Sequence, residues 1–140
     1  MQATTQLPST QPTPARQLTE RYFQTFNENQ FDQTAALFVQ EGKLIPPFDS
    51  PIVGEEAILA YLQKEAENIT AYPARWESEE EGDFTYIKVT GKVNAVVFKV
   101  NVAWYFIIPN AKTDASKIES VRVKLLASPK ELLGLRSVAS

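Results

Sequence analysis

The spacing of the apolar residues changes near residue 70, and this change restricts the chain to few folds. Leu18, Tyr22 and Phe26 recur every fourth residue, which is typical of the buried face of an amphipathic helix. Further along, apolar side chains such as Val102 and Trp104 recur at every second position, which is typical of a strand. Helices followed by strands within one domain's length predict an α+β fold, with the helices on one face of a mainly antiparallel sheet.

Three helices are expected before the period changes. The first is expected over residues 14–27, behind a threonine N-cap and with a proline in its first turn. A short second helix is expected from an asparagine cap at residue 29, through Phe38, to a stop at Gly42. A brief strand over 43–45 and a rigid proline loop over 46–51 should follow. The third helix begins after Gly54 with two glutamates in its first turn.

Four strands are expected in the second half, and one more helix at its end. The strands are predicted at residues 72–78, 84–97, 99–109 and 117–127. The third of these carries large apolar groups on both faces, so we expect it to be covered on both sides. Ser128-Pro129-Lys130-Glu131 forms a capping box that predicts a short C-terminal helix. Residues 1–16 are expected to form a flexible tail, 17–136 the folded domain and 137–140 a second tail.

The composition excludes several kinds of chemistry. The chain has no cysteine and no histidine, which excludes thiol nucleophiles, Ser-His-Asp triads and histidine-based metal sites, and no metal is expected. A net charge of −3 gives no electrostatic basis for binding nucleic acid. No apolar stretch is long enough to span a membrane, and the first 17 residues lack the apolar region of a secretory signal, so a cytoplasmic location is expected. Lysines and arginines at positions 88, 92, 122 and 124 alternate along strand faces, where such residues usually maintain solubility.

Four segments in the same order resemble a known superfamily. They are Pro46–Gly54 (PPFDSPIVG), Phe84–Val93 (FTYIKVTGKV), Asn101–Phe106 (NVAWYF) and Leu125–Leu133 (LLASPKELL). The chain resembles the nuclear-transport-factor-2-like (cystatin-like, SnoaL-like) superfamily. Within it, the chain is most similar to the C-terminal domain of the cyanobacterial orange carotenoid proteins and to the free-standing homologues of that domain. The resemblance implies a cone-shaped fold, with three N-terminal helices packed on a curved sheet and a short C-terminal helix.

The resemblance also implies a ligand and two residues that hold it. In that family a helix tyrosine and a strand tryptophan hydrogen-bond the keto oxygen of a ketocarotenoid such as canthaxanthin or echinenone, and these positions fall on Tyr22 and Trp104. Both side chains combine an apolar body with one hydrogen-bond donor, which suits the binding of a carbonyl group in an apolar pocket. The segment Val93–Val100 is about four residues shorter than in the family and carries only Phe98 in place of a second tryptophan. This difference predicts a narrower pocket.

We expect an apolar sleeve around these two donors. Its expected members are Phe26, Phe38, Ile45, Phe48, Leu62, Val102, Phe106 and Leu125. A domain with a radius of gyration of about 14 Å cannot enclose a long polyene alone. The interpretation is therefore a non-enzymatic carrier related to photoprotection, which forms a homodimer around its ligand or passes the ligand to a partner protein.

Two alternatives remain open at this stage: a pocket for another small hydrophobic ligand, and an enzyme of the ketosteroid isomerase type. By resemblance, the general-base position of such an enzyme falls on Pro46 and its second oxyanion position on about Val102, neither of which can transfer a proton. Asp49 is the nearest carboxylate in the sequence, in a loop where aspartate usually serves a turn. An isomerase would need a carboxylate such as this one.

Overall fold

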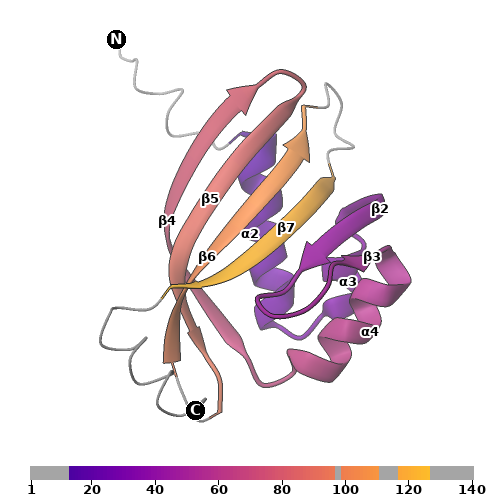
Figure 1. Cartoon of the computed structure of the whole chain (residues 1–140), viewed down its shortest axis with the longest axis vertical. Coiled ribbons are helices and arrows are strands. Elements are labelled where there is room, and N and C mark those ends of the chain that lie inside the picture. Colours follow the sequence, from indigo (N-terminus) through magenta and orange to yellow (C-terminus); the bar gives the residue numbers. More distant parts are fainter. Residues whose placement is uncertain (1–12, 97–98, 111–116, 127–140) are drawn as a thin grey trace.

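A single six-stranded sheet with helices against one face organises the chain in the computed structural model, which describes residues 13–96, 99–110 and 117–126. Figure 1 shows β4–β7 as long, curved strands lying side by side, with α2 running behind them and α3 and α4 beside the short strands. This is the α+β architecture that the change of period predicts. In chain order the elements are α2 (Pro14–Asn27), α3 (Phe31–Ala35), β2 (Phe38–Ile45), β3 (Ile52–Val53), α4 (Glu55–Glu65), β4 (Thr70–Glu81), β5 (Phe84–Asn94), β6 (Lys99–Pro109) and β7 (Ile118–Leu126).

The strands lie in the order β3-β2-β7-β6-β5-β4. All neighbouring pairs are antiparallel except β2 and β7, which run parallel and bring Phe38 opposite Ile118. The hairpin between β4 and β5 turns at Gly82, whose φ of 63° is one that glycine adopts without strain. Strand β4 extends to Glu81, three residues beyond the end that the sequence predicts.

Helix α2 begins as the sequence predicts. The Thr13 side chain accepts a 3.1 Å hydrogen bond from the Arg16 amide, and Pro14 occupies the first turn. Residues 14–16, which the expected domain boundary assigned to the tail, are therefore part of this helix. Helix α4 likewise begins after Gly54, with Ile58 and Leu62 buried.

The predicted second helix is present but shorter than expected, and the predictions for its cap and for residues 36–42 were wrong. Helix α3 ends at Ala35, and Phe38 starts strand β2 instead of continuing the helix. Asn29 does not cap α3: it has a φ of 59°, and Gln30 occupies the cap position without a side-chain hydrogen bond. Gly42 is not a helix stop, because it lies within strand β2. A side chain at this position would come within 2.8 Å of Phe38 Cβ. The glycine allows a bulged strand to fold closely over Phe38.

The inward side of β6 forms the centre of the core. Val102, Trp104, Phe106 and Ile108 are 4% exposed or less and face α2, as the alternation predicts. The opposite face of β6 is covered only in part, since Tyr105 and Ile107 are half-buried and Asn101 is exposed. The expected cover on both sides of this strand is therefore incomplete within the described residues.

Several predictions fall outside the part of the chain that the structure describes. These are the tail up to residue 12, Phe98 and the capping box with its C-terminal helix. In the described segments no helix is long and apolar enough to cross a membrane. The same segments hold no group of three or more potential metal-ligating side chains.

Candidate functional site

An apolar cavity of about 230 Å³ lies between α2, α4 and the inner face of the sheet. Its wall is almost entirely aliphatic or aromatic. It is lined by Tyr22, Phe26, Leu44, Pro46, Pro47, Tyr61, Leu62, Glu65, Ala66, Ile69, Ala71, Val93, Ala95, Val100, Val102, Trp104, Val123 and Leu125. Larger hollows exist on the surface, including one of about 710 Å³ on the outer sheet face, but charged side chains form part of their walls. A few polar groups in an apolar wall are typical of a small-molecule site, so the inner cavity is the candidate site.

Tyr22 is held rigidly at the cavity wall by other aromatic rings. Its ring meets Phe106 edge-on at 5.2 Å between centroids and Phe23 at 5.4 Å, and it stacks on Phe26 at 6.1 Å. Its side chain is 2% exposed, and this burial raises the pKa of the hydroxyl well above its ordinary value, with a further contribution from the nearby Tyr61 hydroxyl. Tyr22 therefore remains a protonated hydrogen-bond donor at any physiological pH.

Trp104 approaches the same cavity from the sheet. It lies on the inner face of β6, opposite Val89 on one side and Val123 on the other, and is 4% exposed. Phe23 packs edge-on against its ring at 4.8 Å. Phe23 therefore contacts both Tyr22 and Trp104 and fixes one relative to the other.

The hydroxyl of Tyr22 and the ring N–H of Trp104 share one property: neither forms a hydrogen bond with another residue of the described segments. The other tryptophan, Trp76, donates its ring N–H to the Thr19 hydroxyl at 3.2 Å, but neither Trp104 nor the Tyr22 hydroxyl donates to another described residue. No fully buried polar side-chain atom among the described residues lacks a partner, and both Tyr22 and Trp104 line the cavity. An O–H and an N–H that open onto one apolar cavity suit a ligand that carries a carbonyl oxygen.

Tyr61 and Glu65 add polarity at one side of the cavity. They lie one turn apart on α4 and both line it. Partial burial raises the pKa of the Tyr61 hydroxyl, and the carboxylates of Asp49 and Glu65 raise it further. Asp49 itself does not line the cavity, and its carboxylate interacts with the Tyr61 hydroxyl.

The structure brings six of the ten expected ligand residues to the cavity. These six are Tyr22, Phe26, Leu62, Val102, Trp104 and Leu125. The other four do not line it. Phe38 and Phe106 are core residues that pack behind the Tyr22 ring, at 6.4 and 5.2 Å. Ile45 does not line the cavity, because its neighbour Leu44 occupies the inward position of the strand. Phe48 is 85% exposed in the proline loop.

Several residues line the cavity that the sequence analysis did not assign to it, although the apolar periodicity of their elements indicates that they face inward. Ala66 and Ile69 continue the apolar stripe of α4, and Val100 continues the inward alternation of β6. Val93, Ala95 and Val100 also show that the described part of the shortened segment contributes to the wall. Val123 follows the same alternation on β7, two positions before the expected Leu125.

Comparison with known proteins gives two groups of relatives. The chain is 42% identical over 120 residues to an orange carotenoid-binding protein of Limnospira maxima, and 43% identical over 117 residues to that of Synechocystis sp.. These matches cover 82% and 80% of this chain but only 37% and 36% of the relatives. The chain thus spans little more than a third of their length.

Solved structures agree with the fold. The orange carotenoid protein of Anabaena (Nostoc) sp., solved with canthaxanthin bound, superposes with a TM-score of 0.72 at 40% identity, over 84% of this chain and 38% of that one. Nuclear transport factor 2 from Cryptosporidium parvum superposes with a TM-score of 0.69 at 17% identity, over 79% of this chain and 90% of that one. Residues 15–118 match the family of the nuclear transport factor 2 (NTF2) domain. The chain therefore belongs to the NTF2 domain family.

Proposed function

We propose that this domain binds a ketocarotenoid, such as canthaxanthin or echinenone, and carries it without chemical turnover. The observation that carries the proposal is that two donors, Tyr22 and Trp104, line one apolar cavity and donate to no other residue of the described segments. A keto oxygen has two lone pairs and accepts both hydrogen bonds at once, while the apolar wall surrounds the ring. The similarity to orange carotenoid proteins supports this ligand class.

The volume of the cavity indicates how much of the ligand enters. At about 230 Å³ it is smaller than the roughly 300–1,000 Å³ of sites that enclose a drug-sized molecule. It therefore holds one ring end, and the polyene extends out of the domain. An extended apolar chain in water is unfavourable, so we propose that a second copy or a partner protein covers it and that the ligand passes between them.

The isomerase alternative has little support from the cavity. Pro46 and Val102 do line it, at the positions where the resemblance would put proton-transferring groups. Among the described lining residues the only carboxylate is Glu65, which is exposed on α4. The carboxylate of Asp49 interacts with the Tyr61 hydroxyl and does not line the cavity. We therefore propose that the domain is not an enzyme.

The test is the visible absorption spectrum of the protein purified from cells that make canthaxanthin or echinenone. The expected result is a red-shifted, protein-bound band that is lost in Tyr22→Phe and Trp104→Phe. Tyr72→Phe, at a half-exposed ring, and Trp76→Phe, whose indole N–H bonds Thr19, are matched controls that should keep the colour. A colourless wild-type protein would exclude carotenoid, and steroid isomerisation lost in Asp49→Asn would restore the enzyme hypothesis.

A further inference from the structure

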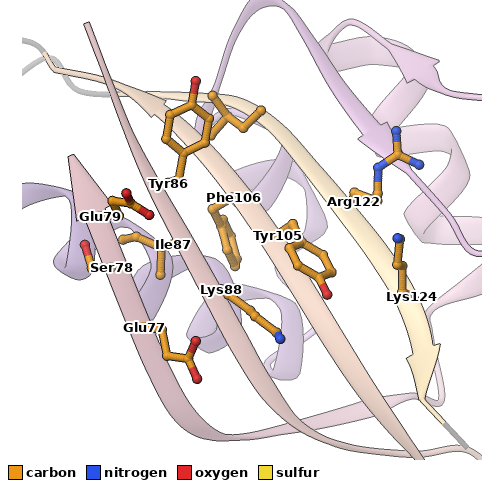
Figure 2. Close-up of a pocket in the computed structure, with 11 residues that line it drawn as sticks. Glu77, Ser78, Glu79, Tyr86, Ile87, Lys88, Tyr105, Phe106, Arg122 and Lys124 are labelled. Carbon is orange, nitrogen blue, oxygen red and sulfur yellow. The ribbon is translucent and has the colours of Figure 1, made fainter. Parts of the chain in front are cut away.

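Among the described residues that line the inner cavity, only four have a polar atom in the side chain. These are Tyr22 on α2, Trp104 on β6, and Tyr61 and Glu65 on α4. The hollow on the outer sheet face is different, because Figure 2 shows carboxylates, ammonium groups and a guanidinium around it. With so few polar atoms in the inner cavity, each of the four restricts what a ligand can carry.

The four polar side chains come from two parts of the cavity wall. Tyr22 and Trp104 each offer a hydrogen-bond donor, and the proposed function assigns both donors to one keto oxygen. Tyr61 and Glu65 lie one turn apart on α4. The proposed function gives these two no part, although they line the same cavity. What α4 offers to a ligand therefore determines what the ligand carries besides its keto group.

Asp49 determines how the Tyr61 hydroxyl can be used. The Asp49 carboxylate forms a hydrogen bond with this hydroxyl, and an ionised carboxylate only accepts, so Tyr61 is the donor. The proton of the hydroxyl is thus directed to Asp49, which does not itself line the cavity. The lone pairs of the Tyr61 oxygen remain to accept a hydrogen bond. Tyr61 therefore offers the cavity an acceptor, whereas Tyr22 and Trp104 offer donors.

The hydroxyls of Tyr61 and Tyr22 are close enough to influence each other. Burial is the main cause of the raised pKa of Tyr22, and the Tyr61 hydroxyl raises this pKa further. The acceptor on α4 and the donor on α2 therefore lie near each other, in one cavity of about 230 Å³. Because a cavity of this volume holds one ring end, a ligand group that reaches Tyr61 must belong to the ring whose keto oxygen is at Tyr22.

We propose that Tyr61 is a specificity-determining residue, which selects a ring with a hydroxyl group on the carbon next to its keto carbon. This inference rests on the proposed function, because it takes the keto oxygen as bound by Tyr22 and Trp104. In a free ring of this kind, the hydroxyl can donate to its own keto oxygen. Once the two donors occupy both lone pairs of that oxygen, the hydroxyl is left to donate to Tyr61.

The expected selectivity corresponds to one hydrogen bond. A hydrogen bond between neutral groups changes affinity about two- to tenfold. Tyr61 is half-buried, so a ring without the hydroxyl leaves the Tyr61 oxygen to water. The preference for a hydroxylated ring is therefore set by the bond that this ring gains, since the other ring buries no acceptor without a partner.

Competition between two pigments tests the inference. Ligand-free protein is incubated with equimolar canthaxanthin and astaxanthin, in which each keto group has a hydroxyl beside it. The bound pigments are then extracted and measured by chromatography. The measured quantity is the ratio of bound astaxanthin to bound canthaxanthin, which does not depend on how much protein is loaded. This ratio should be about two- to tenfold higher for the wild type than for Tyr61→Phe, which keeps the ring and loses the acceptor.

Three further variants identify the group responsible. Asp49→Asn should lower the ratio, because the amide N–H of asparagine can donate to the Tyr61 oxygen and occupy the acceptor. Tyr72→Phe, at a half-exposed ring outside the cavity, is the matched control and should keep the wild-type ratio. A ratio that falls in Glu65→Gln and not in Tyr61→Phe would assign the acceptor to Glu65 and overturn the proposal.

Failure of this inference can be distinguished from failure of the proposed function. A wild type that binds neither pigment overturns both. A wild type that binds canthaxanthin, but with the same ratio as Tyr61→Phe, overturns the role of Tyr61 alone. Thermal unfolding checks that each variant is folded. If Tyr61→Phe does not fold, Asp49→Asn replaces it in the comparison, since Asp49 is exposed in the proline loop.

Discussion

The side-chain amide of Asn27 makes two hydrogen bonds, each 2.8 Å long, to the backbone of Ala71. Its Nδ2 donates to the Ala71 carbonyl, and the Ala71 amide donates to its Oδ1. Asn27 is the last residue of α2, and Ala71 lies at the start of β4 and also lines the cavity. This pair therefore attaches the helix that carries Tyr22 to the edge strand of the sheet.

We expect Asn27→Ala to lower the free energy of unfolding by about 1–3 kcal/mol, because two backbone groups lose their partner. Urea unfolding measures the change. Asn27→Asp keeps the acceptor and loses the donor, so it should fall between the wild type and the alanine variant. An unchanged stability in Asn27→Ala would show that these hydrogen bonds are replaced by water at no cost.

Gly91→Ala should be strongly destabilising although the substitution adds one methyl group. A Cβ at this position would collide with the Tyr72 carbonyl oxygen and lie 2.9 Å from Pro73 Cα, and backbone atoms cannot move aside cheaply. The site is at the irregularity between β4 and β5, where the register shifts after Pro73. We expect a loss of about 2–4 kcal/mol or failure to fold. Gly82→Ala meets no atom within 4 Å and tests the separate effect of a positive φ.

Alkaline pH should destabilise the domain through Tyr22. Burial raises the pKa of Tyr22 in the folded state, whereas the unfolded chain keeps the ordinary value of about 10. The stabilising contribution is therefore complete below about pH 10 and decreases as the pH rises from there towards the folded value. The slope for one proton is about 1.4 kcal/mol per pH unit.

Urea unfolding of Tyr22→Phe between pH 9 and pH 11.5 checks this prediction. The variant should lose the part of the alkaline decrease that one proton accounts for, and Tyr72→Phe is the matched control at a half-exposed ring. Tyr61 contributes in the same direction, since its pKa is also raised by burial and by Asp49 and Glu65. Identical alkaline slopes in the wild type and in Tyr22→Phe would contradict the burial argument.

Ala66→Leu should separate ligand binding from folding. Ala66 is 3% exposed and lines the cavity, so a leucine there extends into about 230 Å³ of apolar space. We expect the stability of the ligand-free protein to be unchanged or raised by up to about 1 kcal/mol, because the larger side chain fills the cavity. Protein purified from carotenoid-producing cells should then be colourless, while Ala74→Leu, at an exposed position on β4, should keep its colour. A coloured Ala66→Leu protein would place the ligand elsewhere.

The parts of the fold that the sequence predicts are those with a long, regular period. The Thr13–Pro14 start of α2, the helix after Gly54 and the alternation of β6 all have local causes, so they could be found without tertiary information. Tyr22 and Trp104 belong to such elements, and this is why their inward direction could be predicted. Their common cavity could be expected only from the family resemblance.

The predictions from the sequence are wrong where tertiary contacts determine the secondary structure or the direction of a side chain. Residues 38–45 become a strand because β7, far along the chain, pairs with them, and nothing local distinguishes Phe38 in a helix from Phe38 in that strand. The three-residue strand that the sequence predicts at 43–45 is too short to fix the inward face, so the sequence does not distinguish Ile45 from Leu44 as the inward residue. In the proline loop no period exists, and the outward direction of Phe48 had no sequence signal.

The parallel pairing of β2 with β7 also determines when, during synthesis of the chain, the cavity can form. Because Phe38 pairs with Ile118, the early strand has no neighbour on that side until nearly the whole domain has been synthesised. Val123 and Leu125 of β7 complete the cavity wall. During translation, therefore, the cavity has no complete wall until β7 has left the ribosome, and a ligand that the cavity encloses can enter only after that point.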